Sequence, residues 1–487
     1  MAPSAVATRD ASLPFRSRVA PWSAIDPEVS MDEPTPWVDD RSAALLTDLY
    51  ELTMLQAYWR EGMDRDAVFS LYYRRLPEPR NYVLAAGLED ALRYLETVSF
   101  PPEGLDFLAG RREFSREFVD WLADFEFTGD VRAMPEGTPV FPYEPLLEVT
   151  GPMPEAQLAE TFIMNQVHFQ SVLASKAARI VEAAGDRAVV DFGLRRMHGT
   201  DAGMKGARAY HIAGVAATSN VLAGRVYGVP ITGTMAHSYV QSHDDELEAF
   251  RAFAEQYPET VLLVDTYDTL DGIRKVVELS DELGDDFRVR AVRLDSGDLA
   301  ELAVESREIL DRAGLEDVEI FASGGLDEYE IAEIVERDAP ITGFGVGTRM
   351  GTARDAPSLD MAYKLTAYSG RGRLKLSSGK RILPGPKQVY RREEDGVYAG
   401  DVVARAGEEP PEGRPLLRTV MEDGERTGAG HTDLDEARER RRRELDRLPE
   451  RIRRVEPADA PYPVQVSEEL EEYEEDVRER VIAETGD

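Results

Sequence analysis

The residues best suited to chemistry recur at regular intervals in the middle of the chain. His237, Asp265, Asp295, Ser323 and Gly347 are 28, 30, 28 and 24 residues apart, and each follows a short apolar run. This interval is the length of one strand plus one helix, which predicts alternating parallel βα units. In an open sheet or a (β/α) barrel of such units, functional groups collect just beyond the carboxyl ends of the strands. The spacing therefore predicts an enzyme site at that edge.

His237 has three possible roles: a buried structural residue, a metal ligand or a side chain that does chemistry. A metal pair with His243 is a poor match, because a spacing of six fits neither one helical face nor a known ligand pair. The position just past a strand end favours chemistry over burial. Asp265, one repeat later, can hold the imidazole in one tautomer and stabilise its charged form. Structural roles are expected for His168, His198 and His211.

Two consecutive strand ends, FASGGLD and GFGVGTRM, are rich in glycine. Backbone N–H groups exposed by glycine beside the start of a helix bind anions, and the last two loops of a barrel commonly bind phosphate. The residues expected to line this anion site are Ser323, Gly324, Gly325, Gly345, Gly347 and Thr348. The segment GFGVG also matches part of a dinucleotide-binding fingerprint. That match is weak, because it falls late in the repeat and the next helix start is poorly defined.

Two further strand ends offer cations, carboxylates and an aromatic ring. The segment VRLDSGDL places Arg293 and Asp295 on the same side of an extended strand, with Asp298 near a helix start. Arg293 suits a carboxylate or phosphate, and Asp295 suits ribose hydroxyls or a Mg²⁺ ion carried by phosphates. The alternative is a structural Arg–Asp pair with a helix cap. The segment VDFGLRRMHG offers a stacking ring and two anion donors, Phe192, Arg195 and Arg196.

The elements that position these residues divide the chain into four regions. Residues 1–38 lack hydrophobic periodicity and predict a disordered or loosely attached tail. Residues 39–158 mix strand-like and helical segments, which predicts a small α/β domain. A long helix and the βα units occupy 159–363 and predict the domain that carries the active site. Residues 364–487 predict a β-meander followed by two charged helices, whose charges are expected to face solvent.

Composition excludes several classes of protein. The 487 residues contain no cysteine, which excludes disulfides, thiolate nucleophiles and Cys-type zinc sites. The net charge of −36 argues against binding to nucleic acid or anionic lipid. Neither a membrane-spanning run nor a secretory h-region is present, so a cytoplasmic location is expected. Two explanations of the acidic, lysine-poor composition stay open, GC-biased codon usage and adaptation to high salt, and the two are compatible.

Seven motifs together make the chain resemble the nicotinate phosphoribosyltransferase family. In family order between about residues 43 and 392, they are LLTDLYELTM, FGLRR, TSNVLAGRVYGVPITGTMAHS, LLVDTYDT, VRLDSGDL, GVGT and LPGPKQVYR. The resemblance implies a type II phosphoribosyltransferase fold: an irregular (β/α) barrel with an α/β N-terminal domain and a β-rich, helical C-terminal part, acting as a homodimer. It implies the NAD salvage reaction of nicotinate with 5-phosphoribosyl 1-pyrophosphate, which gives nicotinate mononucleotide and pyrophosphate. ATP is the expected co-substrate and Mg²⁺ the expected cofactor.

The resemblance also implies roles for individual residues. His237 matches a histidine that is phosphorylated when ATP hydrolysis is coupled to transfer, and Tyr50 matches a tyrosine that reaches the partner subunit's nicotinate. Thr234 and Arg293 match residues around nicotinate, and Thr348 matches a contact to the phosphoribosyl substrate. The chemistry of the residues agrees. Phe192 with Tyr50 can sandwich the ring, Arg293 or Arg195 can bind the carboxylate, and Asp295 can serve the ribose–Mg²⁺ region.

Two departures from the family pattern bear on specificity. The run RRMHGTDAGMKG differs from the usual small residues, which leaves contacts just past Arg196 open. Amide-specific relatives place an acid near ATSN, where this chain has Ser219 and Asn220, and the absence of that acid favours nicotinate over nicotinamide. The alternatives are a nicotinamide phosphoribosyltransferase and an NAD-binding oxidoreductase that uses GFGVG. A non-enzymatic acidic scaffold explains the charge but not the functional strand ends.

Overall fold

A six-stranded parallel sheet carries the strand ends predicted from the sequence. In spatial order its strands are β7 (Ala217–Thr218), β6 (Ala188–Asp191), β11 (Gly343–Val346), β10 (Glu319–Ser323), β9 (Ala291–Leu294) and β8 (Val261–Leu263). Most of their apolar side chains are buried, as in parallel sheets covered by helices. The glycine-rich ends of β10 and β11 lie side by side because these two strands pair directly.

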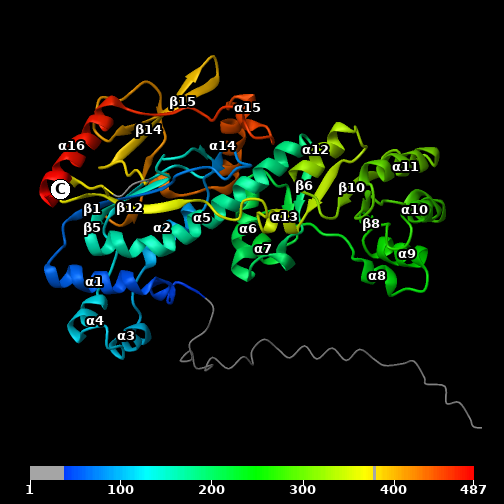
Figure 1. Cartoon of the computed structure of the whole chain (residues 1–487). Coiled ribbons are helices and arrows are strands. Elements are labelled where there is room, and N and C mark those ends of the chain that lie inside the picture. Colours follow the sequence, from blue (N-terminus) through cyan, green and yellow to red (C-terminus); the bar gives the residue numbers. More distant parts are fainter. Residues whose placement is uncertain (1–37, 377–379, 487) are drawn as a thin grey trace, which may run out of the picture. The chain divides into compact units, whose positions relative to one another are not determined.

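The structure is a computed structural model that describes residues 38–376 and 380–486 (Figure 1). All the elements discussed below belong to one unit, Asp40–Asp487. The tail predicted over residues 1–38 lies outside the described residues except for its last position.

Helices separate the parallel strands, as the βα repeat predicts. After β8, β9 and β10 come α10 (Thr269–Leu283), α11 (Leu299–Arg312) and α12 (Glu328–Glu336). Aspartates cap all three helices: Asp268, Asp298 and Asp327 each accept a hydrogen bond from a backbone N–H of the first turn. The N-cap role that the sequence offered for Asp298 is therefore confirmed.

The helices after the other strands are shorter or preceded by a turn. The turn η3 (Leu194–Arg196) and α6 (Thr200–Ile212) follow β6, and α7 (Val221–Tyr227) follows β7. The four-residue α13 (Thr348–Gly351) follows β11. Each strand end thus turns directly into a polar loop or a helix start.

The segment around Ile231 differs from the strand that its apolar residues predict. Ile231 forms a single parallel bridge to Thr218, and the chain then runs through an irregular stretch into α8 (His237–Gln241) and α9 (Glu246–Gln256). In the part of the chain that the structure describes, no strand pairing joins β8 back to β7. The parallel sheet is therefore an open, irregular form of the (β/α) barrel.

A seven-stranded sheet combines strands from both ends of the chain. Its order is β13 (Arg371–Gly372), β12 (Met361–Tyr368), β1 (Asp66–Tyr73), β5 (Leu147–Pro152), β3 (Asp130–Ala133), β17 (Arg418–Glu422) and β18 (Glu425–Arg426). The predicted boundary at residue 364 falls inside β12, and the regions 39–158 and 364–487 are not separate in space. A local hydrophobic pattern indicates a strand but not its partner, so the sequence could not reveal this pairing.

A second, four-stranded sheet is joined to the first by buried charges. It consists of β16 (Arg414–Pro415), β14 (Lys387–Glu394), β15 (Val397–Arg405) and β19 (Val464–Val466). Lys387 and Arg391 of the motif LPGPKQVYR lie on the buried face of β14. Lys387 Nζ lies 3.1 Å from Glu148 on β5 of the first sheet, whereas Arg391 pairs at 2.6 Å with Asp401 on β15 of its own sheet. This motif therefore holds the C-terminal strands to the N-terminal sheet. A small separate sheet pairs β2 (Val83–Leu84) with β4 (Pro139–Val140).

The long helix α5 (Met153–Ala184) connects the antiparallel and parallel sheets. At 32 residues it is roughly 48 Å long. Figure 1 shows it running from the region of α1 (Leu49–Glu61) and α2 (Leu88–Thr97) to that of α6 and α12. Two short helices, α3 (Pro102–Ala109) and α4 (Arg116–Leu122), lie beyond α1. The helix therefore carries contacts between the N-terminal region and the strand ends.

The charged C-terminal helices only partly match the expectation of solvated faces. In α14 (Leu434–Asp446), Arg440, Arg441 and Glu444 are buried. Arg440 donates to the carbonyl oxygen of Glu136 at 2.7 Å, because a long arginine can bury its stem and still reach a polar partner. The expectation is thus corrected for α14. The short α15 (Glu450–Arg453) follows, and most acids of α16 (Glu468–Thr485) are exposed.

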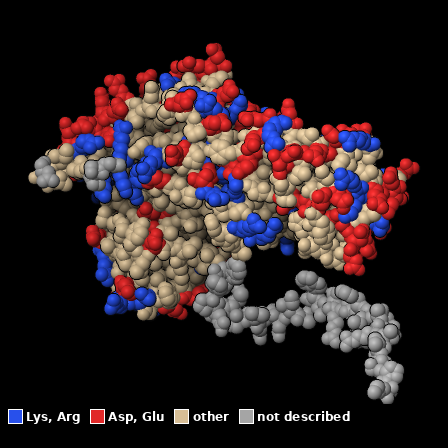
Figure 2. Space-filling model, turned by 45° about the vertical axis from the view of Figure 1, so that its right-hand side comes forward, with Lys and Arg blue, Asp and Glu red and all other residues tan. Residues whose placement is uncertain are grey.

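The acidic excess is spread over the surface. On the face shown in Figure 2, acidic side chains cover much of the molecule and basic side chains lie among them. Within residues 38–376 and 380–486, the helices lack the combination of length and apolar character that crossing a membrane requires.

Candidate active site

Arg293 is the centre of the site at the carboxyl ends of the parallel strands. Its Nη1 donates to Thr234 Oγ1 at 2.5 Å, and its Nε donates to Ser323 Oγ at 2.8 Å. Its Nη2 donates to Asp295 Oδ1 at 2.9 Å. Since these partners come from three segments, the stretch after Ile231 and the ends of β9 and β10, the guanidinium is held in one orientation. The sequence predicted all four residues as site residues, and the structure brings them into one cluster.

An aromatic floor lies beneath Arg293. The guanidinium carbon is 5.3 Å from the centre of the Phe192 ring, and Phe321 lies 6.2 Å beyond it, centre to centre. Gly345 makes room for this floor, because a β-carbon on it would lie 2.6 Å from the Phe192 ring. Gly345 also pairs within β11, between Ser323 and Val190. Packing against Phe192 therefore accounts for Gly345 better than the anion contact predicted for it.

The two glycine-rich loops adjoin this cluster. Gly324 and Gly325 have φ angles of +99° and +69°, which glycine adopts readily. A β-carbon on Gly324 would lie 1.9 Å from the carbonyl oxygen of Asp295, so the loop requires glycine at that position. In the second loop, Arg196 Nη1 donates to Thr348 Oγ1 at 3.0 Å. The loops thus offer backbone, hydroxyl and guanidinium groups next to Arg293.

His237 is the first residue of α8, and its side chain is 41% exposed, which contradicts a core role. Its Nδ1 lies 3.1 Å from Thr266 Oγ1, and its Nε2 lies 3.9 Å from Asp295 Oδ2. Asp265, the partner predicted for the imidazole, instead accepts hydrogen bonds from the backbone N–H of Asp295 and the hydroxyl of Ser296. The spacing identified the correct strand end, but it could not tell which of two consecutive side chains faces His237.

Two carboxylates line the space beside His237. Burial opposes ionisation of Asp295, yet hydrogen bonds from Arg293 and Ser323 hold its pKa below the ordinary value. Asp265 Oδ2 accepts from Asp295 N at 2.9 Å and from Ser296 Oγ at 2.6 Å. Asp265 Oδ1 is buried and has no hydrogen-bond partner among the described residues. A buried carboxylate oxygen left in this state is suited to a ligand.

Tyr50 lies outside this cluster, on α1. Its side chain is 46% exposed, and burial of its hydroxyl together with Glu160 raises its pKa. The exposed apolar residues on this surface, here called the α1 patch, are Leu46, Leu49 and Tyr50. A second exposed group, the α7 patch, lies on α7 and the segment leading to Thr234 and consists of Val221, Leu222, Val226 and Ile231. Arg195 is also exposed, at the η3 turn beside Phe192.

Two supporting residues escaped the sequence interpretation. Asp191, at the end of β6, is buried, and burial raises its pKa. It accepts hydrogen bonds from Gly193 N and Thr218 Oγ1, each at 2.7 Å, and so fixes the loop that carries Phe192. Thr266, the contact of His237, was the other. Asp191 precedes Phe192 in the chain, and Thr266 follows Asp265. Their position next to predicted site residues is the feature of the sequence that could have indicated them.

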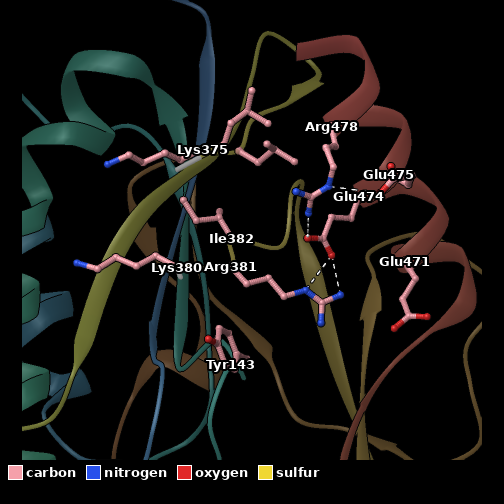
Figure 3. A pocket seen from close by; sticks show the side chains of 11 residues that line it. Tyr143, Lys375, Lys380, Arg381, Ile382, Glu471, Glu474, Glu475 and Arg478 are labelled. Carbon is pink, nitrogen blue, oxygen red and sulfur yellow. Dashed lines mark hydrogen bonds and ion pairs between the residues drawn. The ribbon is translucent and has the colours of Figure 1, made fainter. Parts of the chain in front are cut away.

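A cavity of about 630 Å³ lies between residues 374–376 and 380–382 on one side and α16 on the other (Figure 3). Arg381 and Arg478 converge there on Glu474, at 2.6 and 3.0 Å. Lys375 and Lys380 extend away from Glu474. None of the strand-end residues lines this cavity, so we place the candidate active site at the parallel strand ends.

The sequence of the chain matches the protein-family models of three nicotinate phosphoribosyltransferase domains. The N-terminal domain matches residues 45–168, the nicotinate phosphoribosyltransferase family proper matches 187–390, and the C-terminal domain matches 412–474. The chain belongs to the nicotinate phosphoribosyltransferase family. The resemblance noted from the motifs is thereby confirmed, and it extends into the C-terminal region beyond the last motif.

Curated relatives of this family member support the same conclusion. Nicotinate phosphoribosyltransferase pncB2 of Mycobacterium tuberculosis is 56% identical over 427 residues, which cover 88% of this chain and 92% of the relative. The Bacillus subtilis nicotinate phosphoribosyltransferase is 42% identical and covers 75% of this chain and 76% of the relative. The crystal structure of human nicotinic acid phosphoribosyltransferase aligns with a TM-score of 0.77 at 30% identity, covering 88% of this chain and 98% of that one. The predicted fold class is confirmed.

Proposed function

We propose that this chain transfers the phosphoribosyl group of 5-phosphoribosyl 1-pyrophosphate to nicotinate in NAD salvage. The ring nitrogen of nicotinate attacks the anomeric carbon of the ribose, and the bond from that carbon to pyrophosphate breaks. The products are nicotinate mononucleotide and pyrophosphate. The observation that carries the proposal is Arg293, held by three hydrogen bonds above Phe192 and beside two glycine-rich loops.

Arg293 and Phe192 suit an aromatic carboxylate. Three of the five guanidinium N–H groups are used by Thr234, Ser323 and Asp295, which leaves one on each terminal nitrogen. A carboxylate accepts such a pair of donors through two parallel hydrogen bonds. The Phe192 ring provides a surface for the pyridine ring, and Arg195 at the rim is a second cation near the site.

The phosphoribosyl substrate fits the loops after β10 and β11. The backbone of Ser323 to Gly325 and the Thr348 hydroxyl, with Arg196 beside it, supply neutral and charged donors for phosphate oxygens. Holding both substrates on neighbouring strand ends places the attacking nitrogen near the anomeric carbon. Asp295 is ionised close to where the positive charge of the oxocarbenium-like transition state develops.

The carboxylates also suit the Mg²⁺ ion that the family implies. Among the described residues, no group of three or more His, Cys, Asp or Glu side chains could hold a metal by itself. Mg²⁺ is commonly bound by one or two carboxylates together with substrate phosphates. Asp265 Oδ1 and Asp295 Oδ2 are the oxygens that would hold it here. When bound, Mg²⁺ neutralises the charge that develops on departing pyrophosphate.

His237 is the residue proposed to couple ATP hydrolysis to transfer. Its Nε2 attacks the γ-phosphorus of ATP, the bond to the β-phosphate oxygen breaks, and ADP leaves. Water then cleaves the P–N bond of phosphohistidine and releases phosphate. Thr266 occupies Nδ1, which leaves Nε2 as the nitrogen that faces the substrate edge.

A homodimer would account for Tyr50 and for the two exposed apolar patches. Tyr50 is part of the α1 patch. The α7 patch includes Ile231, three residues before Thr234 in the chain. Exposed apolar surfaces of this kind often mark protein–protein contacts. In the proposed dimer, the α1 patch of one protomer covers the α7 patch of the other, and Tyr50 approaches the partner's nicotinate.

The function is tested by assaying both bases with phosphoribosyl pyrophosphate and ATP. We expect nicotinate to be used far more efficiently than nicotinamide, because Arg293 offers paired donors to a carboxylate. Asn220, near the acid position of amide-specific relatives, uses its side-chain oxygen to cap α7. A higher kcat/KM for nicotinamide would refute the proposed specificity. Hydride transfer to NAD without pyrophosphate release would instead support the oxidoreductase alternative.

Replacing Gly324 with alanine is expected to weaken phosphoribosyl pyrophosphate binding. The new β-carbon would meet the Asp295 carbonyl oxygen at 1.9 Å, so the loop must move. We expect KM for phosphoribosyl pyrophosphate to rise on the order of tenfold or more, because misplaced donors lose charge-assisted hydrogen bonds. Gly314→Ala is the matched control: its φ of +76° is also one that side chains rarely adopt, but its β-carbon meets nothing within 4 Å. Equal effects of the two variants on KM would contradict the expectation.

A further inference from the structure

Lys176 is a buried lysine that bridges two carboxylates behind the site. It lies on α5, and its side chain is 1% exposed. Its Nζ lies 2.5 Å from Glu328 Oε2 and 2.8 Å from Asp355 Oδ1. The chain has only seven lysines among 57 basic residues, and this one is fully enclosed. An ammonium group has three donors and no acceptor, so it can hold two carboxylates at once.

These two carboxylates follow the two glycine-rich loops along the chain. Glu328 begins α12, three residues after Gly325. Asp355 follows α13, seven residues after Thr348. Lys176 therefore connects the segment behind the first loop to the segment behind the second, from a helix that belongs to neither.

Further ion pairs reinforce the same connection. Arg179, one turn along α5, donates to Glu328 Oε1 at 2.9 Å. Arg80, from the N-terminal region, lies 2.6 Å from Asp355 Oδ2. Arg349, the residue after Thr348, lies 2.6 Å from Asp327 in the first loop. The segments that follow the loops are thus joined directly through Arg349, through α5 by Lys176 and Arg179, and through the N-terminal region by Arg80.

The buried part of this cluster carries an excess of positive charge. Within residues 38–376 and 380–486, the ion pairs of Lys176, Arg179 and Arg80 are shared between two carboxylates, and Arg80 Nη2 is buried without a hydrogen-bond partner. Although burial opposes its ionisation, Asp355 has its pKa held below the ordinary value by Arg80 and Lys176. The carboxylate therefore stays charged at neutral pH, and the connection persists.

Stability alone does not explain such a cluster. Apolar residues of similar volume often stabilise a protein as well as a buried ion pair or better, because taking charges out of water is costly. What apolar residues cannot supply is a directional link that fixes two loop segments at a set separation. This cluster supplies that link at the place where the phosphate-binding loops must be spaced correctly.

We propose that Lys176 is a positioning residue that sets the spacing of the two glycine-rich loops and thereby the affinity for 5-phosphoribosyl 1-pyrophosphate. The inference rests on the proposed function. Lys176 does not touch the substrate in this proposal; it acts through Glu328 and Asp355. Loss of Lys176 leaves Arg293 and the aromatic floor beneath it in place, so the affinity for nicotinate should change little.

The experiment compares Lys176→Met with Lys387→Met in the full-length chain. Lys387 is the matched control, because its side chain is 3% exposed and it also pairs with a buried glutamate, Glu148, but on the N-terminal sheet. Binding of phosphoribosyl pyrophosphate alone is measured by isothermal titration calorimetry, and thermal unfolding is measured in parallel. We expect both variants to unfold at lower temperature. Only Lys176→Met should raise the Kd for phosphoribosyl pyrophosphate, at least tenfold.

Two results would overturn the proposal. One is a wild-type Kd for phosphoribosyl pyrophosphate in Lys176→Met, and the other is an equal rise in both variants. If Lys176→Met does not fold, Asp355→Asn removes one arm of the link at a partly exposed position, with an expected rise in Kd of severalfold. An unchanged Kd in that variant also counts against the proposal.

The same measurement separates this proposal from the proposed function. Calorimetry with phosphoribosyl pyrophosphate requires no turnover. A wild-type chain that binds this substrate but transfers nothing to nicotinate would refute the function and leave the comparison of variants valid. A wild-type chain that binds no phosphoribosyl pyrophosphate would overturn both.

Discussion

Replacing His237 with alanine is expected to abolish ATP hydrolysis while leaving some ATP-independent transfer of the phosphoribosyl group. The imidazole is the proposed nucleophile toward the γ-phosphate, and alanine offers no substitute. Nicotinate and phosphoribosyl pyrophosphate bind through Arg293, Phe192 and the glycine-rich loops, which the substitution leaves in place. We therefore expect hydrolysis to fall to background, on the order of 10³-fold or more, when a nucleophile is removed.

The measurement is ADP release and nicotinate mononucleotide formation in the same reaction, with and without ATP. His243→Ala is the matched control. His243 lies six residues away just after α8, and its Nδ1 is 3.0 Å from the carbonyl oxygen of Tyr239. We expect the control to retain both activities. ATP hydrolysis at the wild-type rate in His237→Ala would refute the assignment.

Thr266 provides a finer test of the same residue. It lies 3.1 Å from Nδ1 and fixes the ring, so Thr266→Val should slow ATP hydrolysis without abolishing it. Phosphohistidine trapped from [γ-³²P]ATP should be present in this variant and missing in His237→Ala. Label retained in His237→Ala would place the phosphoryl group on another residue.

The sequence indicated residues that cluster in the structure, but it did not indicate that strands from both ends of the chain share one sheet. Arg293, Asp295 and Ser323 were found because parallel strands place their carboxyl ends together, so regular spacing along the chain becomes proximity in space. Thr266 and Asp191 were missed because side-chain direction at an irregular strand end does not follow from spacing. Gly345 resembled an anion-binding glycine, yet its missing side chain makes room for Phe192.

The long-range pairings were beyond the reach of local pattern. Strand β12 pairs with β1 across nearly 300 residues, and no feature of Met361–Tyr368 specifies that partner. The arginines of α14 look like a solvated face, since burial of Arg440 depends on carbonyl oxygens brought near by tertiary structure. The role of Lys176 likewise could not be predicted from the sequence, because it depends on Glu328 and Asp355, which only the tertiary structure brings to its ammonium group.

Arg293→Met is expected to have the other large effect, a loss of nicotinate use. Two hydrogen bonds to a charged carboxylate contribute about 1.5–3 kcal/mol each, so kcat/KM for nicotinate should fall on the order of 10²–10⁴-fold. Nicotinamide lacks the carboxylate, so its weaker use should change much less. The ratio of the two kcat/KM values should therefore approach one.

The same variant should alter the pH dependence of transfer. In the native chain burial works against ionisation of Asp295, and the hydrogen bonds from Arg293 and Ser323 overcome it and hold the pKa below its ordinary value. Removing Arg293 raises that pKa, so the carboxylate becomes protonated at a higher pH. The acid limb of the kcat/KM profile should move to higher pH in Arg293→Met, because the ionised form is required.

Arg307→Met is the control for losing an arginine that makes several hydrogen bonds, and Arg307 lies on the helix that follows the strand of Arg293. Arg307 on α11 makes hydrogen bonds to Asp311 and to the carbonyl oxygens of Leu315 and Val318. The carbonyl partners lie just before β10, at the amino ends of the parallel strands and so at the edge away from the candidate site. We expect this variant to lose thermal stability yet keep both the preference for nicotinate and the native acid limb. If Arg293→Met kept that preference, the carboxylate would have to be bound elsewhere, and Arg195 at the rim is the cation that would then be tested.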